Sequence, residues 1–139
     1  MALWVVLGAA LGVLCLLPFL KSPTKALTSN GYMALAMMLM IYLGAYLVSG
    51  STERVIYETL FAIAVLALAS FFKKTWPLGI ALLVFLHGSY DHFFGAQSGV
   101  AEWYPPACAG FDMVVGLGLG YLILKNNKRI NGQNNGAKS

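Results

Sequence analysis

The stretch WPLGIALLVFLHGSYDHFFG, residues 76–95, decides the fold of this chain. It is long enough to cross a membrane as a helix, because the hydrocarbon core of a bilayer requires about 20 predominantly apolar residues. Yet it contains both histidines of the chain, His87 and His92, and one of the five acidic side chains, Asp91. Ionisable residues inside a membrane span usually face the interior of a helical bundle and mark functional sites. The stretch therefore predicts a polar site within an apolar bundle.

The composition of the whole chain is that of a membrane protein. Of its 139 residues, 59% are hydrophobic and only 10% are charged, against roughly 45–50% and about 25% in soluble domains. The apolar stretches lack the alternation of a β-barrel, so we predict an all-α integral membrane bundle in a single domain. The net charge of +4 could suggest nucleic acid. However, the basic residues lie at the ends of the spans and in the tail, so no nucleic-acid partner is predicted.

Five transmembrane spans are predicted, at residues 2–20, 31–50, 55–72, 76–95 and 107–124. Residues 1–124 then form the transmembrane domain. In the first span the positive charge follows the apolar core, whereas a cleaved signal peptide carries it before the core, so we expect this span to be retained. The segment KNNKRINGQNNGAKS, residues 125–139, is polar and rich in Asn and Gly. This composition predicts a disordered tail.

The distribution of lysine and arginine predicts the orientation. The chain has nine such residues, and with five spans all but Arg54 fall on the same side as the tail. Basic residues concentrate on the cytoplasmic side of membrane proteins. The N-terminus is therefore expected outside and the C-terminus in the cytoplasm, in a multi-pass protein of the cell membrane.

In this topology the acidic side chains gather in the outer half of the membrane. Glu58, Asp91 and Asp112 lie at similar depths on three different spans, with His87 slightly deeper. A shared polar pocket costs less than exposing each group separately to lipid. The predicted pocket residues are Glu58, His87, Tyr90, Asp91, Cys108 and Asp112.

The spacing within the fourth span suggests how such a pocket could bind a metal ion. His87 and Asp91 are four residues apart and share one helical face. Asp91 could accept a hydrogen bond from one nitrogen of His87 and leave the other nitrogen free to bind metal or move a proton. A divalent metal such as zinc is the candidate cofactor, with Glu58 or Asp112 as a candidate catalytic base. The possible ligands are His87, Asp91, His92 and Asp112.

Small residues recur at four-residue spacing in two of the spans. Gly116 and Gly120 continue such a ridge in the fifth span, and Gly8 and Gly12 form another in the first. Ridges of this kind allow helices to approach closely in membranes. They predict tight helix packing and make a homo-oligomer or a membrane partner conceivable.

Most of the chain, from about Tyr42 to Leu124, resembles a family of small bacterial multi-span membrane proteins defined only as a domain of unknown function, the DUF6010-like family. The similar stretches are YLVSGSTERVIYETLFA (46–62), LGIALLVFLHGSYDHFFG (78–95) and PACAGFD (106–112). The family pattern has a His-His pair two turns after the first histidine and a second cysteine before the last aspartate. This chain has Phe93, Phe94 and Phe111 there. The resemblance implies a bacterial inner membrane, but no activity.

Three functions remain open at this point. An accessory or binding component is favoured by the small size and the glycine ridges. A metal-dependent membrane hydrolase would use the His/carboxylate site, although the chain has no recognisable nucleophile motif. A proton-coupled transporter would use the same residues as a relay, but the inner halves of the spans are apolar.

Overall fold

The chain folds into a bundle of helices, described here from a computed structural model. The structure describes residues 1–49, 51–95 and 100–136. In these residues there is no strand, which confirms the predicted all-α class. The elements are α1 (Ala2–Leu16), continued by a short 3₁₀ turn, η1 (Leu17–Phe19), then α2 (Thr24–Ser49), α3 (Thr52–Thr75), α4 (Leu78–Phe94) and α5 (Tyr104–Gly136).

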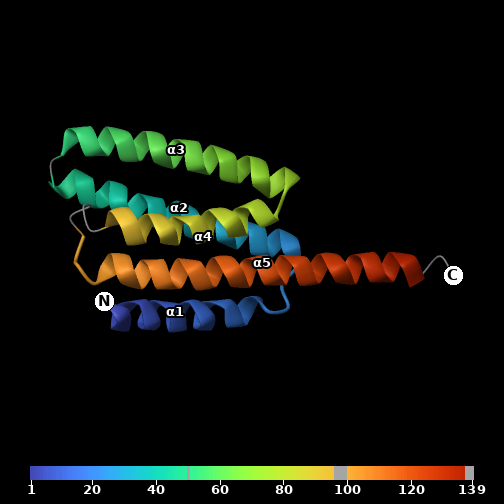
Figure 1. Ribbon diagram of the computed structural model, residues 1–139. Helices are drawn as coiled ribbons and strands as arrows, with labels where there is room; N and C mark the ends of the chain where they lie inside the picture. Colours follow the sequence, from blue (N-terminus) through green and yellow to red (C-terminus); the bar gives the residue numbers. More distant parts are fainter. Residues whose placement is uncertain (50, 96–99, 137–139) are drawn as a thin grey trace.

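Successive helices run in opposite directions (Figure 1). α5 lies between α1 and α4, while α2 and α3 pack together on the other side of α4. The start of α3, the end of α4 and the start of α5 consequently meet at one end of the bundle. This arrangement brings the regions of Glu58, Asp91 and Asp112 to the same end, opposite the lysines at the end of α3.

Four of the helices, α1 with η1, α2, α3 and α5, are long and apolar enough to cross a membrane. α4 has 17 residues, which corresponds to about 26 Å of helix against a hydrocarbon thickness of about 30 Å. It is the central helix, with seven buried positions. Surrounding helices, rather than lipid, cover most of its polar residues. The chain is therefore a multi-pass membrane protein with four or five spanning helices.

The surface of α1 supports this conclusion. Its only buried residues are Gly8 and Gly12. Large apolar side chains point outward all around the rest of the helix; Leu3 is 65% exposed and Leu14 is 60% exposed. Such a surface would be unfavourable in water and is suited to lipid.

α2 begins earlier than the sequence predicts. Residues 21–30 were expected to form a loop, but the helix starts at Thr24. The Thr28 hydroxyl donates to the Thr24 carbonyl at 3.1 Å, and the Asn30 amide donates to the Ala26 carbonyl at 2.9 Å. These bonds to carbonyls one turn earlier let polar residues remain within a helix. The break between the first two helices is therefore shorter than predicted, because α2 begins within the segment 21–30.

α5 continues where a disordered tail was expected. The structure shows helix beyond Lys125 as far as Gly136. No proline follows Pro106 in the sequence, and extending an existing helix costs much less than starting one. The Asn126 amide also donates to the Ser22 carbonyl at 3.0 Å. This contact ties the extension to the connection between α1 and α2.

The glycine ridges allow α5 to contact its neighbours backbone to backbone. A Cβ added to Gly8 would lie 1.8 Å from the Ala107 carbonyl oxygen, and one added to Gly116 would lie 2.7 Å from the Phe85 backbone nitrogen. The predicted tight packing is thus found inside the chain. Each of the four ridge glycines, Gly8, Gly12, Gly116 and Gly120, faces another helix of the same chain. Association with a second copy or a membrane partner through these glycines stays a prediction.

Candidate functional site

One end of the bundle holds nearly all the buried polar groups. Among the described residues, the buried polar and charged side chains are Thr28, Glu58, His87, Asp91 and Asp112. Thr28 lies near the start of α2, while the other four lie at the opposite end. Asp91 and Asp112 are completely inaccessible, and His87 is 5% exposed. Burying ionisable groups this deeply in an apolar bundle is costly unless they are compensated.

The centre of the site is a contact between α4 and α5. His87 Nδ1 lies 2.8 Å from Asp112 Oδ2 and 3.6 Å from Asp91 Oδ2. His87 therefore donates to Asp112, in the tautomer that carries its proton on Nδ1. The sequence suggested Asp91 as the hydrogen-bond partner. That expectation is wrong, because the neighbouring helix supplies a carboxylate at shorter range.

Gly88 explains how α5 comes so close to His87. A Cβ added to Gly88 would lie 3.0 Å from the Ala109 carbonyl oxygen and 3.0 Å from Asp112 Cβ. A larger residue would push α5 away from α4 at this level. The glycine next to His87 is thus what places Asp112 within hydrogen-bonding distance of the imidazole.

Several buried polar atoms of this group have no hydrogen-bond partner within the described part of the chain. They are both carboxylate oxygens of Asp91, Oδ1 of Asp112 and Nε2 of His87. No lysine or arginine among the described residues forms an ion pair with either carboxylate. Buried polar atoms in proteins are nearly always paired. The group therefore has unused capacity to bind protons or a cation.

The same three residues can supply one ligand atom each to a metal ion. These atoms all lie within 4.8 Å of one another. Zinc bonds to nitrogen and oxygen ligands of about 2.0–2.2 Å imply separations of about 3.4 Å between the ligands of a tetrahedral site. The measured 2.8 Å and 3.6 Å lie on either side of this value. The spacing of one nitrogen and two carboxylates is thus compatible with the ligand set of a divalent cation.

Tyrosine side chains surround the group on the side of α2. The Tyr42 ring lies 6.1 Å from the His87 ring and 6.0 Å from the Tyr90 ring, measured between centroids. Tyr42 is 1% exposed and lies close to Asp91, although its hydroxyl forms no hydrogen bond of ordinary geometry within the described residues. Its hydroxyl is therefore a further polar group facing the site.

Glu58 belongs to an adjoining contact rather than to the metal-ligand group. Its Oε1 accepts a hydrogen bond from the Tyr90 hydroxyl at 2.5 Å, and the Tyr90 ring stacks on Phe61 with 5.2 Å between centroids. Among the described residues, the group with metal-ligand spacing comprises residues of α4 and α5 only. Three helices do contribute buried carboxylates, but α3 is linked to the others through Tyr90.

Cys108 lies on the other side of the group. It is close enough to Asp112 and Asp91 to interact with them electrostatically, and its thiol donates to the Tyr104 hydroxyl at 3.5 Å. Both Cys108 and Tyr104 also line an apolar cavity of about 350 Å³ between α1, α2 and α5. The site is therefore separated from an apolar cavity by these two side chains.

No family model, curated protein or solved structure matches this chain. The predicted membership of the DUF6010-like family stays a prediction.

His92 does not join the other predicted ligands. It is exposed, and its ring contacts the neighbouring Phe93 ring at 5.1 Å between centroids. One helical position turns a side chain by about 100°, which is enough to direct His92 away from the face that carries Asp91. His92 is therefore excluded from the site in this arrangement.

Tyr42 and Tyr46 on α2 were not among the pocket residues predicted from the sequence. Both are buried, at 1% and 5% exposure, and four residues separate them, so they share a face. A signal was present, because Tyr42 and Tyr46 are four residues apart in a predominantly apolar span. Buried tyrosine hydroxyls usually seek a polar partner, which points toward a polar interior at their level.

Proposed function

We propose that this multi-pass membrane protein is a binding component that holds a divalent cation, such as zinc, at His87, Asp91 and Asp112. The observation that carries the proposal is the metal-ligand spacing of these three residues, together with the buried carboxylate oxygens of Asp91 and Asp112 that have no hydrogen-bond partner within the described residues. Two ionised carboxylates and a neutral imidazole carry a charge of −2. A divalent cation would neutralise this charge inside an apolar bundle, where uncompensated charge is costly.

The ligands would play different roles. Asp91 has both oxygens free of hydrogen bonds within the described residues, so it can bind a cation without losing an existing contact. Asp112 shares one oxygen with His87 and has the other free. His87 would bind through Nδ1, with its ring proton on Nε2. Because an imidazolium cannot bind a cation, protonation of His87 would make binding weaker in acid.

Competition between zinc and a chromophoric chelator, performed on the full chain in detergent, tests this proposal. Wild-type protein is expected to bind one ion per chain. His87→Ala should weaken binding by more than the roughly 10–100-fold that losing an outer partner costs. His92→Ala is the matched control and should bind like the wild type. Equal affinity in His87→Ala and wild type would refute the assignment.

A metal-dependent hydrolase is the second candidate, and one observation favours it. Three protein ligands leave a position for water in a zinc site, and the apolar cavity of about 350 Å³ lies beside Cys108 and Tyr104. Such a cavity could accept an acyl chain from the bilayer. Zinc-dependent release of a fatty acid from phospholipid vesicles, abolished by Asp91→Asn, would support this role. Zinc binding without any hydrolysis of the phospholipid would contradict the hydrolase and support the binding role.

Proton-coupled transport gains no comparable support. Beyond the site, toward the basic end of the bundle, the core between α4 and α5 is apolar. It contains Ile80, Val84, Leu119 and Ile123. A relay for protons needs polar side chains or water along its length.

A further inference from the structure

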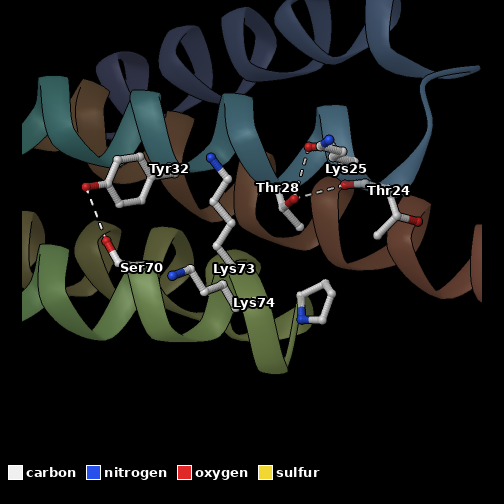
Figure 2. A pocket seen from close by; sticks show the side chains of 8 residues that line it. Thr24, Lys25, Thr28, Tyr32, Ser70, Lys73 and Lys74 are labelled. Atoms are coloured by element: carbon white, nitrogen blue, oxygen red, sulfur yellow. Dashed lines mark hydrogen bonds between the residues drawn. The ribbon is translucent and has the colours of Figure 1, made fainter.

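A cavity lined by basic and hydroxyl side chains lies at the end of the bundle opposite the His87 group. It has a volume of about 750 Å³ and opens between the start of α2 and the end of α3 (Figure 2). Three lysines and several hydroxyl groups line it, and no acidic residue does. The lining groups important here are Lys25, Lys73, Lys74, Thr24, Tyr32 and Ser70.

The positive charge of this cavity is not neutralised by the chain. The ammonium group of Lys73 extends from α3 toward α2 (Figure 2). It donates to the Ser29 hydroxyl at 3.1 Å and lies 5.4 Å from the centre of the Tyr32 ring. None of the three lysines forms an ion pair within the described residues. The cavity therefore offers three positive charges to an anion.

Hydroxyl groups add hydrogen-bonding capacity between the lysines. Thr24 Oγ1 is buried and has no partner among the described residues. The Ser70 hydroxyl donates a long hydrogen bond to the Tyr32 hydroxyl, at 3.4 Å. Phosphate oxygens accept hydrogen bonds both from ammonium groups and from hydroxyls, and the charged donors make the stronger bonds. Lysines and hydroxyls around one cavity thus suit a phosphate group.

The surroundings place the cavity at the membrane surface. Trp76 follows α3 directly and is 46% exposed. Tryptophan is enriched at the level of the lipid headgroups. The adjacent helices bear apolar, outward-facing residues such as Phe71 and Met33, which are 58% and 57% exposed. A lipid could therefore lie along the bundle with its headgroup at the lysines.

We propose that this cavity binds the phosphate-bearing headgroup of an anionic phospholipid. Basic cavities between membrane helices on the cytoplasmic side bind such headgroups, and the sequence predicts that this end faces the cytoplasm. The proposal is independent of the His87 group at the other end. The cavity would recognise the phosphate group, and a lipid of the bilayer would supply it.

The test measures binding of fluorescent phosphatidylglycerol and phosphatidylcholine to the full chain in mild detergent. Phosphatidylglycerol is expected to bind more tightly. Replacing one lysine with glutamine should weaken its binding about fivefold, because each lysine near the surface contributes about 1 kcal/mol. The triple variant Lys25→Gln, Lys73→Gln, Lys74→Gln should lose about a hundredfold.

A second triple variant is the matched control. Lys21→Gln, Lys125→Gln, Lys128→Gln removes the same charge outside the cavity and should change binding less than threefold. Equal losses in both triple variants, or equal binding of the two lipids, would overturn the proposal. So would displacement of the lipid by inorganic phosphate at micromolar concentration, which would indicate a soluble ligand. If the triple variant fails to fold, judged by circular dichroism, the single variant Lys73→Gln decides.

Discussion

His87 Nδ1 and Asp112 Oδ2 lie 2.8 Å apart, although 25 positions separate the two residues in the sequence. This contact joins the end of α4 to the start of α5 within a fully buried region. Asp91, on the same helix as His87, lies farther from the imidazole nitrogen, at 3.6 Å. The two carboxylates thus differ in role, since Asp112 accepts a hydrogen bond from His87 whereas Asp91 accepts none within the described residues.

Asp112→Ala should destabilise the protein. Removal of the carboxylate leaves the buried Nδ1–H of His87 without its acceptor, and an unsatisfied buried donor costs about 1–3 kcal/mol. Thermal unfolding in detergent is the measurement. Asp112→Asn retains an oxygen acceptor and should lose less. An asparagine variant that loses as much stability as the alanine variant would show that charge, not hydrogen bonding, holds this contact.

Gly8→Ala should separate α1 from α5. The added Cβ would lie 1.8 Å from the Ala107 carbonyl oxygen. This oxygen belongs to the backbone of α5, so it can move away only if the two helices separate. We expect a loss of about 1–3 kcal/mol, typical of overpacking, as a lower unfolding temperature in detergent. Gly44→Ala is the control, because nothing lies within 4 Å of its added Cβ. Similar losses in both variants would contradict this packing.

Glu58→Gln should leave metal binding intact. Glutamine can still accept the hydrogen bond from Tyr90, and Glu58 lies outside the group of three ligands. Zinc stoichiometry and affinity are therefore expected to match the wild type. Tyr90→Phe, which deprives Glu58 of this donor, should reduce stability by about 1–3 kcal/mol. If Glu58→Gln fails to bind zinc, Glu58 is also a ligand, and the metal site includes α3 as well as α4 and α5.

Much of the fold could be predicted from the sequence because membrane spans obey simple length and composition rules. The number of apolar segments predicted the number of long helices, and the small residues around Gly8 predicted close packing between helices. Boundaries were less predictable. The polar composition of residues 24–30 predicts a loop. The segment is nevertheless helical, because the side chains of Thr28 and Asn30 donate hydrogen bonds to backbone carbonyls one turn earlier.

The site could be predicted only in part. The sequence brought His87, Asp91 and Asp112 together through their similar depths, and the structure groups these three. Depth alone does not fix rotation about a helix axis. It therefore could not show that His92 points away, that Glu58 is bound by Tyr90, or that Tyr42 covers the group.

Elemental analysis of the full chain, purified from membranes without chelators, tests the central claim most directly. The proposed site predicts about one divalent metal ion per wild-type chain and in the control His92→Ala. It predicts almost none in Asp91→Asn, whose free carboxylate is replaced, provided that circular dichroism shows this variant to be folded. Wild-type protein without metal, even after incubation with zinc, or an Asp91→Asn variant that retains a full equivalent, would contradict the account.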